Sequence, residues 1–143
     1  MTKYCKKIYS DLPFAHRQHH HDGHCSRIHG HSWTFEFDFA AEDLDESGFV
    51  LDFGSLKWLK HYIDKHFDHT LVLNYDDPKL EEIDYLGISN ITIVSSCSSE
   101  GIAEHLIRIA APYIQRLTDS RARLLSVTVH EDSKNSAQIF NDE

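Results

Sequence analysis

The fold is decided by the stretch His29-Gly30-His31-Ser32-Trp33-Thr34-Phe35-Glu36-Phe37-Asp38-Phe39. From Trp33 onward, aromatic residues alternate with polar ones, and a period of two residues is typical of a strand with one buried face. If this strand begins at His29, the side chains of His29 and His31 share a face. The stretch therefore predicts a long strand that presents two imidazoles on one side.

Two amphipathic helices are expected after this strand. Asp52 can cap the first helix, whose apolar residues follow at spacings of three and four and which should end near Asp68-His69. The second helix should begin after the capping hydroxyls of Ser98 and Ser99, and Pro112 favours a bend or an earlier end. The predicted apolar faces comprise Leu56, Leu59, Ile63 and Phe67 in the first helix, and Ile102, Leu106, Ile109, Tyr113 and Leu117 in the second.

Short strands are expected at residues 3–10, 49–51, 91–94, 125–129 and 137–140, and residues 74–88 are expected to form a loop. In the strand at 125–129, Leu125, Val127 and Val129 should lie on one side, and the same parity points Glu131 with them. That is an unusual place for a carboxylate. Together the elements predict an α+β fold, with an antiparallel sheet of about four or more strands and two helices packed on one face.

The composition limits the class of protein. A length of 143 residues fits one domain, so we expect residues 1–143 to form a single domain. The net charge of -9 argues against a nucleic-acid-binding protein, which would have a basic face. No apolar run approaches a membrane span and the N-terminus lacks the apolar region of a secretory signal, so we expect a cytoplasmic protein without a membrane partner. Cys5, Cys25 and Cys97 are too few, and odd in number, for a disulfide framework.

Histidines supply the candidate metal ligands. His29 and His31 on the strand, with His16 from the preceding loop, can give three nitrogens to one metal ion. Zinc suits this set, because catalytic zinc keeps three protein ligands and an open position. Each of the three could instead be an ordinary surface histidine. The run His19-His20-His21 and His24 are alternative ligands that the spacing does not exclude.

Three further groups could take part in chemistry. Cys25 lies four residues before His29, and a thiol near a cation ionises more readily, so it could act as a base or nucleophile. It could equally be a small buried apolar residue or a fourth ligand of a structural zinc site. Asp68-His69 is a carboxylate–imidazole pair that can move a proton if the fold brings it to Cys25. Glu131 could accept paired N–H bonds from a planar heterocycle, form a salt bridge, or turn outward at the strand end.

Taken together, these motifs resemble the 6-pyruvoyltetrahydropterin synthase and 6-carboxytetrahydropterin synthase family. The matching segments occur in the family's order over most of the chain: Phe14-Ala15-His16, Cys25 to His31, Gly48 to Gly54, Asp68-His69 with Leu73-Asn74, the helix onset at Ser99 and Glu100, and Val129-His130-Glu131. One such motif could be chance, whereas several in the right order are specific.

The resemblance implies a tunnelling fold, in which small sheets from several subunits join into a barrel with active sites at the interfaces. It implies a homo-oligomer built on trimers, such as a hexamer, and a pterin as the small-molecule partner. The residues that match the family's functional positions are the zinc ligands His16, His29 and His31, the catalytic base Cys25, its partners Asp68 and His69, and Glu131, the carboxylate that anchors the pterin ring. In such enzymes the Asp-His pair typically reaches the cysteine from a neighbouring subunit.

The resemblance also implies a substrate, 7,8-dihydroneopterin triphosphate. The carboxy-forming branch releases triphosphate and acetaldehyde and feeds the synthesis of 7-deazaguanine compounds such as queuosine. Three residues separate Cys25 from His29, which resembles that branch, because the pyruvoyl-forming enzymes usually place more residues there. The alternatives are a 6-pyruvoyltetrahydropterin synthase with the same site and a non-catalytic protein with a structural zinc.

One segment departs from the family pattern. Many members have Pro-Thr-x-Glu before the second helix, whereas this chain has Cys97-Ser98-Ser99-Glu100. We expect Ser98, Ser99 and Glu100 to contact the pterin. Arg17 and Arg27 are the nearest basic candidates for the triphosphate.

Overall fold

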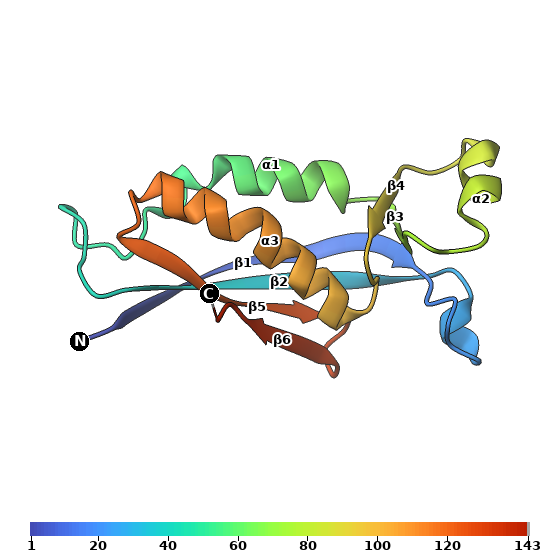
Figure 1. Cartoon of the computed structure of the whole chain (residues 1–143), viewed down its shortest axis with the longest axis horizontal. Helices are drawn as coiled ribbons and strands as arrows, with labels where there is room; N and C mark the ends of the chain where they lie inside the picture. Colours follow the sequence, from blue (N-terminus) through green and yellow to red (C-terminus); the bar gives the residue numbers. More distant parts are fainter. Residues whose placement is uncertain (143) are drawn as a thin grey trace.

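A computed structural model describes residues 1–142 and contains one curved, six-stranded sheet with helices along one face (Figure 1). The strands are β1 (Lys3–His16), β2 (His29–Ala41), β3 (Leu71–Asn74), β4 (Ile91–Val94), β5 (Ala122–His130) and β6 (Ser136–Phe140). The helices are α1 (Lys57–His66), α2 (Leu80–Leu86) and α3 (Ser99–Leu117), with short 3₁₀ turns at His24–Ser26 and Phe53–Ser55.

The sheet is mixed, with the strand order β4-β3-β1-β2-β5-β6. β1, β2, β5 and β6 pair antiparallel, which confirms the four-stranded antiparallel core of the prediction. β3 runs parallel to both β1 and β4, so the purely antiparallel prediction was wrong at this edge. All four residues of β3 are buried. Such a strand shows no alternation and is hard to recognise in the sequence.

The long strand β2 is confirmed, and its aromatic face forms the centre of the core. Trp33, Phe35, Phe37 and Phe39 are each 0% exposed and belong to one core cluster with the buried residues of α1 and α3. Burying one such side chain contributes roughly 1.5–3 kcal/mol to stability. These four residues therefore fix the strand's face and, with it, the face on which His29 and His31 lie.

β1 is longer than predicted, and this corrects the position of His16. The strand does not stop at residue 10. An irregularity between Tyr9 and Leu12, with Asp11 at φ 57°, shifts its alternation by one residue, which hides the continuation in the sequence pattern. Beyond it the strand continues to His16, which pairs directly with His29. His16 is thus held on a strand and not on a loop.

The apolar face of α1 is confirmed, since Leu56, Leu59, Ile63 and Phe67 are all buried. Asp52 caps a different element, because its carboxylate accepts a hydrogen bond from Gly54 N in the 3₁₀ turn that precedes α1. No helix within residues 1–142 is long and apolar enough to span a membrane.

α3 begins as predicted, with Ser98 Oγ accepting from Gly101 N, but it continues through Pro112 to Leu117. The predicted apolar face was partly wrong, because Leu117 is 37% exposed. The buried positions of α3 are Ile102, Ala103, Leu106, Ala110 and Ile114. The second half of the buried stripe is offset by one residue, with Ala110 and Ile114 buried where Ile109 and Tyr113 were expected, and those two are only half-buried.

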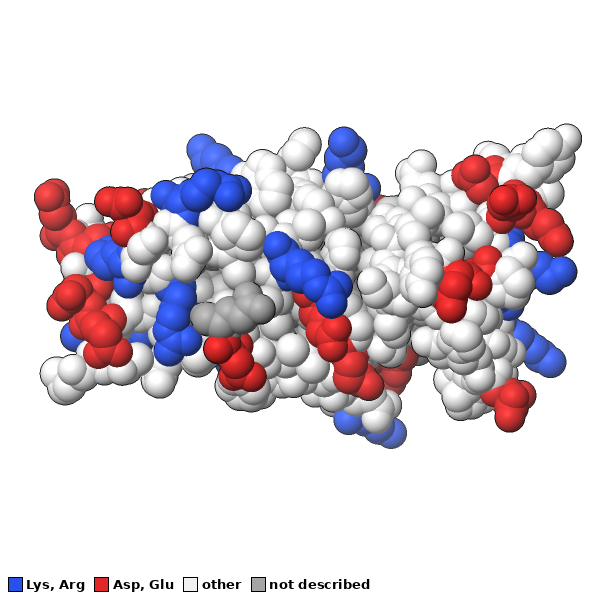
Figure 2. Space-filling view, in the orientation of Figure 1, with Lys and Arg blue, Asp and Glu red and all other residues white. Residues whose placement is uncertain are grey.

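Two further elements differ from the prediction. Residues 49–51 form no strand, because Arg121 donates hydrogen bonds to the carbonyl oxygens of Phe49 and Val50 where a neighbouring strand would pair. The expected loop at 74–88 contains α2, which ends at Gly87 in a left-handed conformation. Figure 2 shows acidic and basic side chains interspersed over one face of the molecule.

β5 contains a register shift opposite Asp38 and Phe39, and this shift corrects the predicted parity of Leu125. Leu124 is buried in its place, whereas Val127 and Val129 point into the core as expected. Because Val129 pairs with Phe35, the next inward position of the chain lies opposite Trp33. Glu131 occupies that position.

Candidate active site

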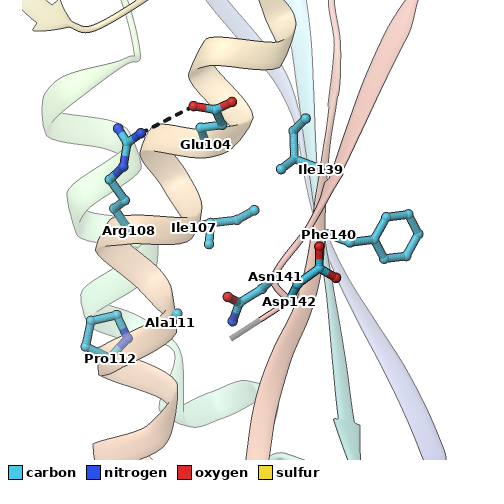
Figure 3. A pocket seen from close by; sticks show the side chains of 9 residues that line it. All are labelled: Glu104, Ile107, Arg108, Ala111, Pro112, Ile139, Phe140, Asn141 and Asp142. Atoms are coloured by element: carbon cyan, nitrogen blue, oxygen red, sulfur yellow. Dashed lines mark hydrogen bonds and ion pairs between the residues drawn. The ribbon is translucent and has the colours of Figure 1, made fainter.

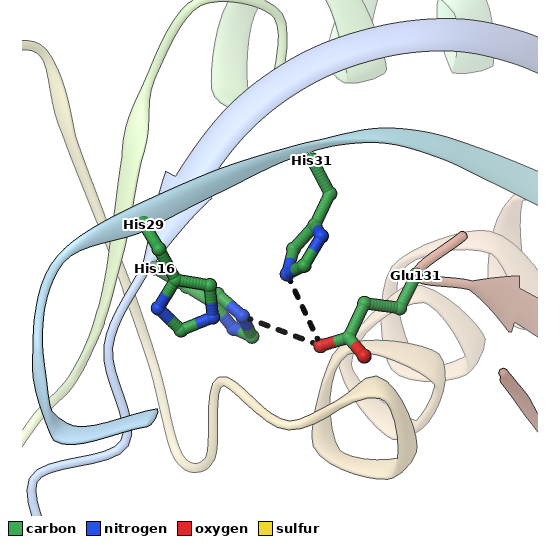
Figure 4. A group of neighbouring side chains, drawn as sticks. All are labelled: His16, His29, His31 and Glu131. Carbon is green, nitrogen blue, oxygen red and sulfur yellow. Dashed lines mark ion pairs between the residues drawn. The ribbon is translucent and has the colours of Figure 1, made fainter. Parts of the chain in front are cut away.

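Three imidazoles and one carboxylate converge at the end of the sheet (Figure 4). His16 comes from the last residue of β1, His29 and His31 from the start of β2, and Glu131 from just after β5. One possible ligand atom from each of the four residues lies within 4.8 Å of the other three. The ring centroids of the histidines are 4.6 to 5.5 Å apart, so the three rings surround a common point.

Buried aromatic side chains pack against two of these rings, those of His16 and His31. Trp33 lies edge-to-face with His16 at 4.9 Å and with His31 at 5.3 Å. Phe14 stacks on Trp33 at 4.3 Å, and Trp33 Nε1 donates to the Phe14 carbonyl. The imidazoles therefore rest on fully packed side chains, which limits their rotation.

Hydrogen bonds fix the tautomers of two histidines. His16 Nδ1 lies 2.7 Å from the Cys97 carbonyl oxygen, and His29 Nδ1 lies 2.7 Å from that of Arg27. A carbonyl only accepts, so each Nδ1 must bear the proton and each Nε2 keeps a lone pair in the neutral ring. Burial lowers the pKa of His16, which keeps this ring neutral near pH 7. A metal-ligating histidine is usually oriented by this kind of bond.

The donor set fits a cation. His16 Nε2 and His31 Nε2 are buried and have no hydrogen-bond partner among the described residues. Glu131 Oε1 lies 3.5 Å from the first and 3.4 Å from the second, which is too long for a good hydrogen bond. The lone pair of His16 Nε2 faces this carboxylate, and the two repel each other unless positive charge lies between them. Three imidazole nitrogens with an adjacent open position are the set that catalytic zinc uses.

A cavity of about 340 Å³ opens beside this group and brings most of the predicted site residues together. Its lining includes His16, His29, Cys25 and Glu131, and also Ser98, Ser99 and Glu100 at the start of α3. Ser98 Oγ is already the helix cap. The sequence analysis missed three lining residues, Gln18, Asn135 and Ser136, which belong to no motif.

Asp68 and His69 lie outside this cavity. His69 Nδ1 pairs with Asp68 Oδ1 at 2.8 Å, and the His69 side chain is 79% exposed. Within the described chain the pair does not line the cavity that contains Cys25.

The two basic candidates for the triphosphate differ in their surroundings. Arg17 is engaged by Asp77 at 2.5 and 2.7 Å and by the Ser26 carbonyl, whereas Arg27 is exposed. Neither lines the cavity beside the histidines.

The alternative ligands form no part of the main group. His19 and His20 lie with Asp76 in a second, more exposed group, in which Asp76 oxygens are 3.7 and 3.3 Å from the two rings. His21 lines the cavity but uses Nδ1 to accept from Gly23 N. His24 belongs to neither group.

A larger cavity, of about 520 Å³, lies between α3 and β6 (Figure 3). Its charged residues include Glu104 and Arg108, which pair with each other at 3.3 Å. None of the predicted site residues lines it. Size alone therefore does not identify the chemical site.

Comparisons with known proteins bear on the family and the fold of this chain. Residues 6–142 match a protein family described as 6-pyruvoyl tetrahydropterin synthase. The chain is 37% identical over 109 residues to the 6-carboxy-5,6,7,8-tetrahydropterin synthase of Rickettsia typhi, covering 74% of this chain and 78% of that protein. It is 44% identical over 55 residues to the enzyme of the same name from Bacillus subtilis, covering 38% of this chain and 36% of that protein.

Solved structures share the fold. An uncharacterized protein from Wolinella succinogenes superposes with a TM-score of 0.85 at 22% identity, covering 99% of both chains. The 6-pyruvoyltetrahydropterin synthase of Plasmodium vivax superposes with a TM-score of 0.69 at 16% identity, again over 99% of both chains. The family match covers nearly the whole sequence, and the chain therefore belongs to the 6-pyruvoyl tetrahydropterin synthase family.

Proposed function

We propose that the protein is a 6-carboxy-5,6,7,8-tetrahydropterin synthase. It would convert 7,8-dihydroneopterin triphosphate to 6-carboxytetrahydropterin, with release of acetaldehyde and triphosphate, in the cytoplasmic synthesis of 7-deazaguanine compounds such as queuosine. One observation carries the proposal: the ring nitrogens of His16, His29 and His31 converge, and two of these histidines line the same cavity as Cys25. The curated relatives and the three-residue spacing between Cys25 and His29 favour the carboxy-forming reaction.

His16, His29 and His31 would hold one Zn²⁺ through their ring nitrogens. When bound, the ion supplies Lewis-acid polarisation of the side-chain oxygens of the substrate. Cys25 lies on the cavity wall and takes a proton from the substrate carbon and returns it. One feature supports this division of roles: Cys25 lines the cavity but is absent from the group of possible metal ligands.

The pterin ring would lie between the start of α3 and the end of β5. Glu131 is half-buried and can accept two N–H bonds from a planar heterocycle. Ser98, Ser99 and Glu100 line the opposite side of the same cavity and add polar contacts.

The Asp68-His69 pair would act on a neighbouring subunit. It is exposed and does not line its own chain's cavity, so its proton-transfer role needs a second chain that brings it to Cys25. We therefore propose a trimer-based homo-oligomer, such as a hexamer, with active sites at the interfaces. Mixing Cys25→Ala and His69→Ala chains should restore turnover in assembled oligomers, whereas no restoration would refute a shared site.

Product analysis tests the reaction. The protein is incubated with 7,8-dihydroneopterin triphosphate and the products are identified by mass spectrometry. A 6-carboxy product with acetaldehyde supports the proposal, and a pyruvoyl product would assign the chain to the other branch. Cys25→Ala should abolish turnover and keep its zinc. If zinc and fold are lost together, Cys25 is a structural ligand and the catalytic proposal fails.

Metal analysis tests the ligands. We expect about one zinc ion per chain, as in a three-histidine site, and a clear loss of zinc in His29→Ala and in His31→Ala. His24→Ala is the matched control, because His24 is an exposed histidine of the adjacent turn and lies outside the ligand group. Undiminished zinc in both site variants would refute the assignment.

A further inference from the structure

A buried amide lies behind the candidate active site. Asn74, the last residue of β3, is 2% exposed. Its Oδ1 accepts a hydrogen bond from Cys97 N at 2.7 Å, and its Nδ2 donates to Gln18 Oε1 at 2.8 Å. A backbone N–H only donates, so the bond from Cys97 fixes which end of the amide is oxygen. Both ends of the Asn74 side chain are thereby committed.

Each of these two hydrogen bonds begins a chain of contacts, which we call an arm. The first arm leads from Asn74 through Cys97 to His16. Cys97 is 0% exposed, and its carbonyl is the acceptor that holds His16 Nδ1 at 2.7 Å. Its thiol donates to the Arg17 carbonyl at 2.9 Å. The backbone of Cys97 is therefore held on one side by Asn74 and orients a candidate metal ligand on the other.

The second arm leads to Cys25. Gln18, which receives the Asn74 amide, also donates its backbone N–H to the Cys25 carbonyl at 2.8 Å. Gln18 lies on the same cavity wall as Cys25. The connection between β1 and β2, which places the thiol, is thus tied to Asn74 through Gln18, and Asn74 Nδ2 also lies 3.2 Å from His19 Nδ1 in the same connection.

We infer that Asn74 is a positioning residue that holds the metal ligand His16 and the thiol of Cys25 in register with each other. The roles of His16 and Cys25 rest on the proposed function, whereas the contacts of Asn74 do not. Removing the group that directly orients a metal ligand commonly changes metal affinity or activity by about 10–100-fold, and Asn74 acts one step further out, through Cys97, so the lower end of this range is expected. A purely structural asparagine would change global stability and leave the local readouts alone.

Asn74→Ala removes both arms. We expect its zinc affinity, measured by competition with a chromophoric chelator, to fall by about tenfold. The visible absorption of the cobalt-substituted protein should change in position or intensity, because the geometry at His16 relaxes. Alkylation of Cys25 by iodoacetamide, followed at its peptide by mass spectrometry under saturating zinc, should become several-fold faster as the loop opens.

Thr92→Val is the matched control. Thr92 is also buried on this edge of the sheet, on β4, and its hydroxyl bonds the His66 carbonyl away from the cavity. It loses one buried hydrogen bond, so its unfolding midpoint should fall, yet its zinc affinity, cobalt spectrum and Cys25 alkylation should match the wild type. If Asn74→Ala and Thr92→Val behave alike in these three readouts, the inference is overturned.

Gln18→Leu separates the two arms. It breaks the link toward Cys25 and leaves the path from Asn74 through Cys97 to His16 intact. We expect faster alkylation of Cys25 with zinc affinity within about twofold of the wild type, well below the effect of losing a ligand's support. Equal losses of zinc in Gln18→Leu and Asn74→Ala would contradict the two-arm arrangement. Should Asn74→Ala fail to fold, Asn74→Ser and Gln18→Leu give the same comparisons.

None of these readouts uses the pterin substrate. A wild-type protein that forms no tetrahydropterin product, together with variants that behave as above, would refute the proposed function and leave the role of Asn74 standing. A fully active wild-type protein whose Asn74→Ala variant binds zinc and shields Cys25 normally would support the proposed function and refute the role of Asn74.

Discussion

The ion pair between Arg17 and Asp77 gives a prediction whose size follows from the structure. Arg17 Nε and Nη2 donate to the two carboxylate oxygens of Asp77 at 2.7 and 2.5 Å, and Nη1 donates to the Ser26 carbonyl at 3.1 Å. The Asp77 side chain is 0% exposed. Arg17→Met keeps most of the apolar stem, removes three hydrogen bonds and leaves a buried carboxylate without its cation.

Breaking a buried ion pair in this way costs about 3–5 kcal/mol. Asp77 Oδ1 still accepts from Lys79 N at 2.9 Å in the variant, which places the expected loss at the lower end, about 3 kcal/mol. For a chain of this size, such a loss lowers the melting temperature by roughly 6–12 °C. Urea unfolding at one fixed protein concentration, followed by circular dichroism, measures the difference.

The effect should depend on pH with a defined sign. The bond from Arg17 holds the pKa of Asp77 below its usual range, so the pair's contribution is present above the unfolded pKa of about 4 and is lost as the pH falls through the folded value. Without Arg17, the buried carboxyl takes up a proton more readily. The stability gap between wild type and Arg17→Met should therefore narrow as the pH falls below about 4.

A double variant provides the check on this reasoning. Arg17→Met/Asp77→Asn replaces the unpaired buried charge by a neutral amide, so it should be more stable than Arg17→Met alone. If the free energy of unfolding falls by less than about 1 kcal/mol in the single variant, this pair contributes no more to stability than an exposed ion pair does. A gap that does not narrow below about pH 4 would refute the charge-based explanation.

Three further outcomes follow from single side chains. Glu131→Gln should lower kcat/KM by about 10–100-fold with zinc unchanged, since a charged acceptor contributes about 1.5–3 kcal/mol; loss of zinc would instead make Glu131 a fourth ligand. Ser98→Ala removes the cap of α3 and should cost about 1 kcal/mol in urea unfolding, and an unchanged midpoint would mean that Gly101 N finds another acceptor. Leu59→Ala, at a position 0% exposed, should cost about 2–5 kcal/mol, whereas a cost below 1 would contradict the packing of α1.

The core elements could be predicted because their patterns are strong. Phe35 and Phe37 alternate with charged residues, and Leu59 and Ile63 follow a helical spacing, so each pattern specifies one buried face. β3 could not be predicted in the same way, because a short strand buried on both faces has no period. The shift at Leu125 was equally hidden, since one extra residue reverses the parity of what precedes it.

The site could be predicted as a set of residue types but not as a geometry. His29 and His31 share a face by strand parity alone. Their meeting with His16 depends on the register of β1 against β2, which pairs His16 with His29, and on the irregularity near Asp11 that carries the strand that far. Register follows from packing between strands, which the local pattern of one strand does not determine.

The backbone at His69 adds a physical reason for its exposed position. His69 has φ 56°, a left-handed conformation that costs a residue with a Cβ about 1 kcal/mol or more, and its N–H donates to the Pro13 carbonyl at 2.7 Å. That bond joins the turn after α1 to β1, at the residue immediately before Phe14-Ala15-His16 completes the strand. The fold thus maintains a strained turn whose side chain, paired with Asp68, points into solvent.

A glycine would adopt this turn more easily, so His69→Gly should retain or increase stability. It should also abolish turnover if the imidazole serves a neighbouring subunit's Cys25. Full activity in a stable His69→Gly protein would leave the strained histidine without a catalytic role.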